Sequence, residues 1–150
     1  CVLQTHAAAG VGVATQRDGL LPNTQHSLLI YDAVAYHDFE GAATELEERE
    51  RIVADLGDKR VLILRNHGLL TVGRSVGEAF IWMYRAERAC RMQLAFQGAG
   101  VPGYPLPDAV VEKTIEQGRN FASGNRHPVG SREWPAMLRL VERIAPEYKN

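Results

Sequence analysis

Two of the five histidines stand near the ends of short apolar segments, where a side chain can do chemistry. His6 follows residues 1–5, which are apolar at alternate positions, and His67 comes shortly after the branched-chain run 61–64. Functional residues are often found where a sheet meets its loops. An imidazole there can bind Zn²⁺ at about 2.0–2.1 Å if two or three further ligands converge. A hydrogen bond at the strand end is the alternative use of the same side chain, and spacing alone leaves both interpretations open.

The other three histidines fall in segments that we expect to be loops. His26 and His37 lie in the region between the first two expected helices, and His127 lies in a late segment rich in Gly and Pro. We expect all three to be solvated or structural. Three acidic residues lie near His37 in the sequence: Asp32, Asp38 and Glu40. A loop of mixed charge is usually a solvated surface, so no site is assigned there.

Motifs for other chemistries are missing from the sequence or stand in the wrong context. There is no GxxxxGK[ST], no HExxH and no GxSxG, so phosphate-loop, zincin and hydrolase-elbow chemistry have no support. Residues 98–103 match GxGxxG, but they follow an expected helix instead of a strand and include Pro102. We interpret this segment as a helix terminator.

Hydrophobic periodicity predicts the elements that hold these residues. We expect strands at 1–5, 61–64 and 69–72, and helices at 7–13, about 45–56, 76–98, 108–121 and 133–144. The apolar run 27–30 is expected to be loop with a short strand. Alternating strands and helices predict an α/β or α+β domain, in which helices cover a mixed, mostly antiparallel sheet.

Local signals support two of these helices in particular. Thr44 and Ser75 each stand three residues before a Glu, which is the spacing of a capping box. In helix 45–56 an apolar stripe predicts an amphipathic surface helix: Leu46, Ile52, Val53 and Leu56.

Composition indicates one ordinary globular domain. The chain has 150 residues, 45% of them hydrophobic, and 17 basic against 18 acidic residues give a net charge of −1. This balance lacks the basic footprint of a nucleic-acid or membrane-surface binder, and no apolar stretch approaches the roughly 20 residues of a spanning helix. Cys1 and Cys90 lie far apart and form no CxxC pair, which favours a reducing compartment. We therefore expect a cytoplasmic protein with no nucleic-acid or membrane partner.

Several segments closely resemble the class II aldolase/adducin family. The longest is Val61-Leu62-Ile63-Leu64-Arg65-Asn66-His67-Gly68-Leu69-Leu70-Thr71-Val72-Gly73, with Glu78-Ala79-Phe80 after it. Upstream, residues 1–7 resemble the family's V-x-H-T-H segment, residues 18–22 its next block, and residues 35–41 the adducin-type branch. Residues 133–139 resemble a C-terminal helix of adducin-like members.

The resemblance implies a fold and a metal site. The fold would be a three-layer α/β/α sandwich around a mixed, mostly antiparallel sheet. Family enzymes hold a divalent metal, usually Zn²⁺, with both histidines of H-x-H and the histidine of N-H-G, and the metal stabilises a substrate enediolate. Carried over, the ligand positions are His67, His6 and Gln4, and the amide of Gln4 is a weaker ligand than imidazole. The catalytic residue is unassigned, because the family's acid/base Glu would lie upstream of residue 1.

The same resemblance implies a domain organisation. We expect residues 1–150 to be a single domain that lacks its N-terminal part, with residues 99–150 as a C-terminal helical extension. Family members commonly assemble as homotetramers.

Three functions follow as hypotheses. The first is a metal-dependent, aldolase-like enzyme acting on a small sugar or sugar phosphate, with an activity weakened by Gln4. The second is a non-catalytic, adducin-like scaffold that oligomerises or binds proteins. The third is an α/β domain with an unrelated small-molecule role.

Overall fold

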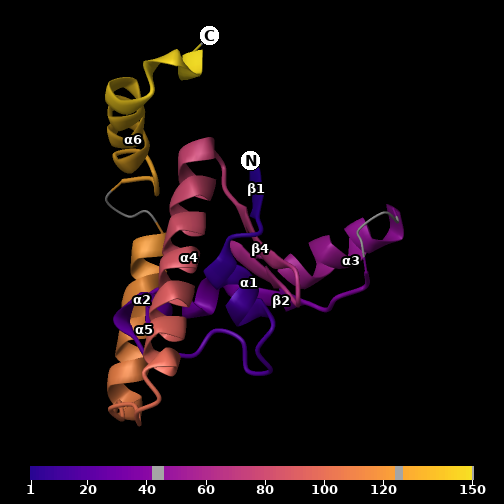
Figure 1. The fold of residues 1–150 in the computed structure, drawn as a ribbon, viewed down its shortest axis with the longest axis vertical. Coiled ribbons are helices and arrows are strands. Elements are labelled where there is room, and N and C mark those ends of the chain that lie inside the picture. The colour runs from indigo at the N-terminus through magenta and orange to yellow at the C-terminus, as the bar shows by residue number, and fades with distance from the viewer. Residues whose placement is uncertain (42–45, 124–126, 150) are drawn as a thin grey trace.

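The computed structural model describes residues 1–41, 46–123 and 127–149 (Figure 1). The strands are β1 (Val2–Thr5), β2 (Val34–His37), β3 (Val61–Leu64) and β4 (Gly68–Val72). The helices are α1 (Ala8–Ala14), α2 (Gln25–Leu28), α3 (Leu46–Leu56), α4 (Val76–Gly98), α5 (Asp108–Ala122) and α6 (Glu133–Ile144). Two short 3₁₀ turns, η1 (Tyr31–Ala33) and η2 (Pro146–Lys149), complete the described elements.

The four strands form one mixed sheet in the order β1-β4-β3-β2. β4 pairs antiparallel with both β1 and β3, whereas β2 runs parallel to β3. Parallel neighbours need a crossover, and α3 supplies it between β2 and β3. As a result β1, β2 and β3 all end at the same edge of the sheet, where β4 begins. The expected mixed, mostly antiparallel sheet is confirmed.

Helices cover the sheet in layers, as Figure 1 shows. Val61 and Ile63 of β3 join the core beneath α1 and α4, while Leu62 and Leu64 alternate to the other face and are also buried. α3 packs along β2 and β3. The β3 run is thus covered on both faces, as its lack of alternation predicts.

α1 approaches the sheet closely because it is built from small residues. A Cβ added to Gly10 would lie 2.7 Å from Cγ of Leu69 on β4. The Gly10 N–H also donates a 2.9 Å hydrogen bond to Glu87 of α4, which ties α1 to the longest helix. The Ala/Gly content of residues 7–13 therefore permits the close packing.

α4 is the central helix, and its bounds match the prediction. The Ser75 hydroxyl accepts a hydrogen bond from the Glu78 N–H at 3.1 Å, so the expected cap is present. α6 packs at the beginning of α4 (Figure 1), where the rings of Phe80 and Trp134 lie 5.4 Å apart. In the described ranges, no helix has the length and apolarity needed to cross a membrane.

Two sequence expectations about local structure are wrong. Residues 25–28 form α2 instead of loop, because Thr24 and Ser27 exchange side-chain and backbone hydrogen bonds as a reciprocal cap. In α3 only half of the expected stripe faces the sheet: Ile52 and Leu56 are half-buried, whereas Leu46 and Val53 are 66% and 68% exposed. Glu48, on the same face as Ile52 and Leu56, is the buried side chain of α3. The predicted cap at Thr44 and the predicted first residue Glu45 lie outside the described residues.

Candidate functional site

The sheet topology brings Gln4, His6 and His67 together. Gln4 lies on β1, His6 follows the last residue of β1, and His67 lies in the turn that joins β3 to β4. β1 pairs with β4 so that Thr5 faces Leu69, which puts His6 beside the start of β4. Sixty-three residues separate Gln4 from His67 in the sequence, but strand pairing makes their side chains neighbours.

The Asn-His-Gly turn has its shape for steric reasons. Asn66 has a φ of 55°, in the left-handed region that Asn tolerates better than most residues. A Cβ on Gly68 would stand 2.4 Å from the carbonyl oxygen of Thr5, so only glycine allows β1 to pass this close. Together the two residues present His67 toward the end of β1.

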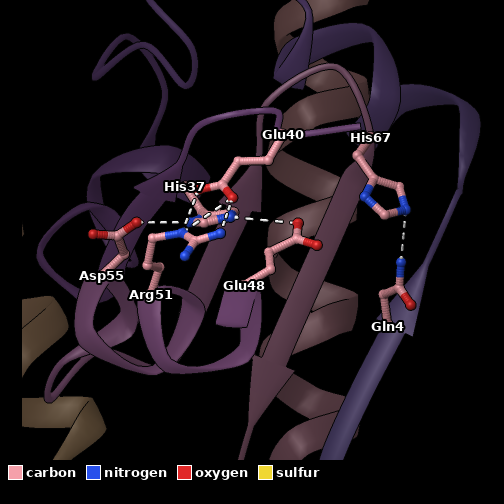
Figure 2. Close-up of polar contacts among 7 residues, drawn as sticks. All are labelled: Gln4, His37, Glu40, Glu48, Arg51, Asp55 and His67. Carbon is pink, nitrogen blue, oxygen red and sulfur yellow. Dashed lines mark hydrogen bonds and ion pairs between the residues drawn. The ribbon is translucent and has the colours of Figure 1, made fainter. Parts of the chain in front are cut away.

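The Gln4 amide lies between the two imidazole rings. Its Nε2 is 3.0 Å from Nε2 of His6 and 3.1 Å from Nε2 of His67. An amide nitrogen only donates, so in this arrangement both ring Nε2 atoms accept. The two rings lie 4.8 Å apart, and Figure 2 shows Gln4 pointing from β1 toward His67.

The two imidazoles fit a divalent metal, and Gln4 fits it less well. Each ring turns its Nε2, an atom that can bind Zn²⁺ at about 2.0–2.1 Å, toward the same amide nitrogen, at 3.0 and 3.1 Å. The Gln4 NH₂ has no lone pair to offer, so Gln4 would serve only with its amide turned to present the oxygen. The described residues contain no group of three His, Cys, Asp or Glu side chains arranged around a common metal position. The donor set is thus two good ligands and one weak one.

The cluster is open to solvent. Gln4 and His6 are exposed and His67 is half-buried. The ring of Phe39 stands edge-on to His67 at 6.5 Å and is itself 54% exposed. A small polar molecule can therefore reach the ring nitrogens.

Neighbouring groups hold the turn before His67 in place. The Arg65 guanidinium lies 4.2 Å over the ring of Tyr36 and donates to the carbonyl of Gln16 at 2.9 Å. The Tyr36 hydroxyl accepts a hydrogen bond from the Leu20 N–H at 3.0 Å. Burial raises the pKa of Tyr36, which keeps this hydroxyl neutral.

His37 is not a loop residue, contrary to the sequence expectation. It is the last residue of β2 and only 4% exposed. Its Nδ1 lies 2.7 Å from a carboxylate oxygen of Asp55, and its Nε2 lies 3.6 Å from one of Glu48, both on α3 (Figure 2). The His37 carbonyl accepts the Arg65 N–H at 2.9 Å. His37 thus holds α3 against the sheet through its ring, and its carbonyl holds the residue that follows β3, two positions before His67.

Glu40, one of the acidic residues near His37 in the sequence, forms an ion pair at the surface. It forms a forked ion pair with Arg51 of α3. This pair lies beside His37 in Figure 2. The other two histidines contact arginines: His26 accepts from Arg88 and His127 is bonded to Arg132.

Comparisons with known proteins agree with this architecture. Residues 1–94 match the family described as Class II Aldolase and Adducin N-terminal domain. A Caulobacter vibrioides protein named "Putative aldolase class 2 protein" is 42% identical over 147 residues, which are 98% of this chain and 56% of that protein. Mouse alpha-adducin is 35% identical over 96% of this chain and 21% of its own length.

Solved structures share the fold. An aldolase II superfamily protein from Pseudomonas syringae superposes with a TM-score of 0.89 at 46% identity, covering 99% of this chain and 59% of that one. The L-fuculose 1-phosphate aldolase of Glaciozyma antarctica superposes with a TM-score of 0.72 at 24% identity, over 97% of this chain and 53% of that one. The chain belongs to the class II aldolase and adducin family. It spans a little over half the length of the bacterial relatives.

Proposed function

We propose that Gln4, His6 and His67 form the divalent-metal site of an aldolase-type lyase that acts on a small sugar or sugar phosphate. The observation that carries this proposal is the convergence of the two imidazole Nε2 atoms on one amide within 3.1 Å at an exposed sheet edge. The name of a fold relative, the L-fuculose 1-phosphate aldolase of Glaciozyma antarctica, supports the substrate class.

Each residue would have a distinct role. His6 and His67 would hold the metal through Nε2, with their protons kept on Nδ1. Gln4 would turn its amide oxygen inward and add a weak third ligand. A bound divalent cation supplies Lewis-acid stabilisation of negative charge on substrate oxygens. The exposure of Gln4 and His6 leaves room for the substrate on the solvent side.

A second candidate is a non-catalytic scaffold of the adducin type. One observation favours it: the Gln4 amide already satisfies both imidazoles, so the cluster needs no cation for its hydrogen bonds. The 35% identity to alpha-adducin is consistent with this role. On this account the cluster would serve only to join β1 to the β3–β4 turn.

Thermal unfolding with and without zinc tests the metal site. A ligand bound only by the native state raises the melting temperature by mass action. We expect Zn²⁺ to raise the melting temperature of the purified protein, EDTA to reverse the rise, and His67→Ala to abolish it. His127→Ala is the matched control, because His127 lies in the loop before α6 and contacts Arg132. No zinc effect on the unchanged protein would contradict the proposal.

Activity is tested by aldehyde release from small ketose 1-phosphates. We expect cleavage with added Zn²⁺ and a large loss in the His6→Ala and His67→Ala variants. A protein that binds zinc but cleaves none of these substrates would contradict the lyase activity, and one that does neither would support the scaffold. Assembly as a homotetramer and a cytoplasmic location stay predictions.

A further inference from the structure

A second cleft lies on the helical side of the molecule, away from the histidine cluster. It has a volume of about 450 Å³ and opens between α2, α4 and α5, at the beginning of α6. Its walls are mainly apolar: Leu29, Ile30, Ile81 and Phe121. Gln4, His6 and His67 do not line it. Its size and apolar lining are those of a small-molecule site.

Arg85 brings a positive charge to this cleft, and no carboxylate of the described residues is in ion-pair contact with it. The residue is half-buried on α4, and its guanidinium lies 5.7 Å over the ring of the buried Trp82. Within the described part of the chain it has no hydrogen bond and no ion pair. Burial lowers the pKa of Arg85, and nearby Glu133 partly offsets this effect. Glu133 offsets only part of the cost of taking this guanidinium out of water, and a bound anion would offset more of it.

The other arginines around the helices show the contrast. Arg119 of α5 is bonded through two nitrogens to Asp32, at 2.9 and 3.2 Å. Arg88, one turn after Arg85 on α4, donates to the Tyr84 hydroxyl and to His26. Arg85 therefore has free donors in the cleft, whereas those of Arg88 are partly used.

The charge of the cleft favours a singly charged ligand. Arg85 and Arg88 contribute two positive charges, and Glu133 at the start of α6 contributes one negative charge. A bound monoanion would bring the net charge of the cleft to about zero, whereas a dianion would leave the complex negative. A planar guanidinium matches a carboxylate through two parallel hydrogen bonds.

We propose that this cleft binds a small aromatic monocarboxylate, with the carboxylate on Arg85 and the ring against Ile81 and Phe121. The ring would gain from burial against the apolar walls. The site is independent of the histidine cluster and of any metal there.

Calorimetric titration with phenylacetate tests the site. The titration is made on the purified protein in EDTA, so that a metal on the histidine cluster cannot bind the probe. For a ligand of this size we expect a Kd of about 0.1–1 mM. Arg85→Gln should weaken binding by about tenfold or more, because a charge-assisted pair is lost. Arg91→Gln is the matched control: it lies on the same helix, is 74% exposed and does not line the cleft.

Two further probes, one uncharged and one doubly charged, test the proposal on the unchanged protein by comparison with phenylacetate. Phenylacetamide has the same ring without the charge, and phenyl phosphate carries a second charge. We expect phenylacetate to bind at least about tenfold more tightly than phenylacetamide and more tightly than phenyl phosphate. No binding of phenylacetate, equal binding of acid and amide, or tighter binding of phenyl phosphate would each overturn the proposal.

Discussion

Two histidine clusters stand at the same edge of the sheet and differ in what surrounds them. His37 is buried at the end of β2 and lies between two carboxylates of α3. His6 and His67 lie at the ends of β1 and β3, near solvent, and share a neutral amide. Burial and charge fix the first cluster as part of the framework. The second can exchange its amide for another ligand at little cost, because water can reach it.

The largest effect is expected when the exposed cluster is given a third imidazole, which tests whether it is an exchangeable ligand site. Gln4→His replaces the weak amide with a strong ligand. Because even supporting groups around a metal change its affinity by 10–100-fold, we expect zinc affinity to rise by about 100-fold. Competition with a chromophoric chelator measures it. Gln4→Ala is the control and should not gain affinity; an equal gain in both variants would show that Gln4 merely obstructs the site.

Removal of the buried imidazole should cost stability and leave metal binding largely intact. His37→Ala leaves Glu48, which is only 8% exposed, without its partner. We expect a loss of about 2–3 kcal/mol in the free energy of unfolding, measured by urea denaturation. If this variant lost zinc binding but kept its stability, the division between framework and exchangeable cluster would be wrong.

The turn that presents His67 should tolerate no side chain at Gly68. Gly68→Ala would press a methyl group against the Thr5 carbonyl and push β1 away from β4. We expect a loss of about 1–3 kcal/mol together with weaker zinc binding. Gly98→Ala, where a Cβ meets nothing within 4 Å, is the control and should be neutral or slightly stabilising. Equal effects of the two changes would count against the steric account.

The smallest expected effect concerns Tyr36, which lies under Arg65. Since burial raises its pKa, its contribution is complete below pH 10 and is lost as the pH rises above this value, where the unfolded chain ionises first. Tyr36→Phe should cost about 1 kcal/mol at pH 7, because the Leu20 N–H loses its acceptor. It should also reduce the loss of stability above pH 10. Urea denaturation at pH 7 and above pH 10 measures both, and an unchanged alkaline profile would refute this role.

Strong local signals made much of the fold predictable. α4 and α6 have the predicted bounds, and β3 is buried on both faces as its sequence indicates. α2 escaped prediction because a four-residue helix has no periodicity, and its cap is a Thr–Ser pair instead of Thr–Glu.

The sites were predictable only in part. The resemblance names Gln4, His6 and His67, but their separations depend on the pairing of β1 with β4, which the sequence does not reveal. His37 escaped prediction because its burial is created by α3, which turns Glu48 inward and exposes Leu46 and Val53. The free charge of Arg85 likewise appears only once the partners of the other arginines are known.

Metal content per subunit tests the central claim most directly. The protein is purified without a His tag or chelator, dialysed against micromolar zinc, and measured by plasma mass spectrometry beside His67→Ala. The account predicts close to one zinc per subunit for the unchanged protein and close to none for the variant. A ratio near zero for the unchanged protein, or an equal ratio for both, would contradict it.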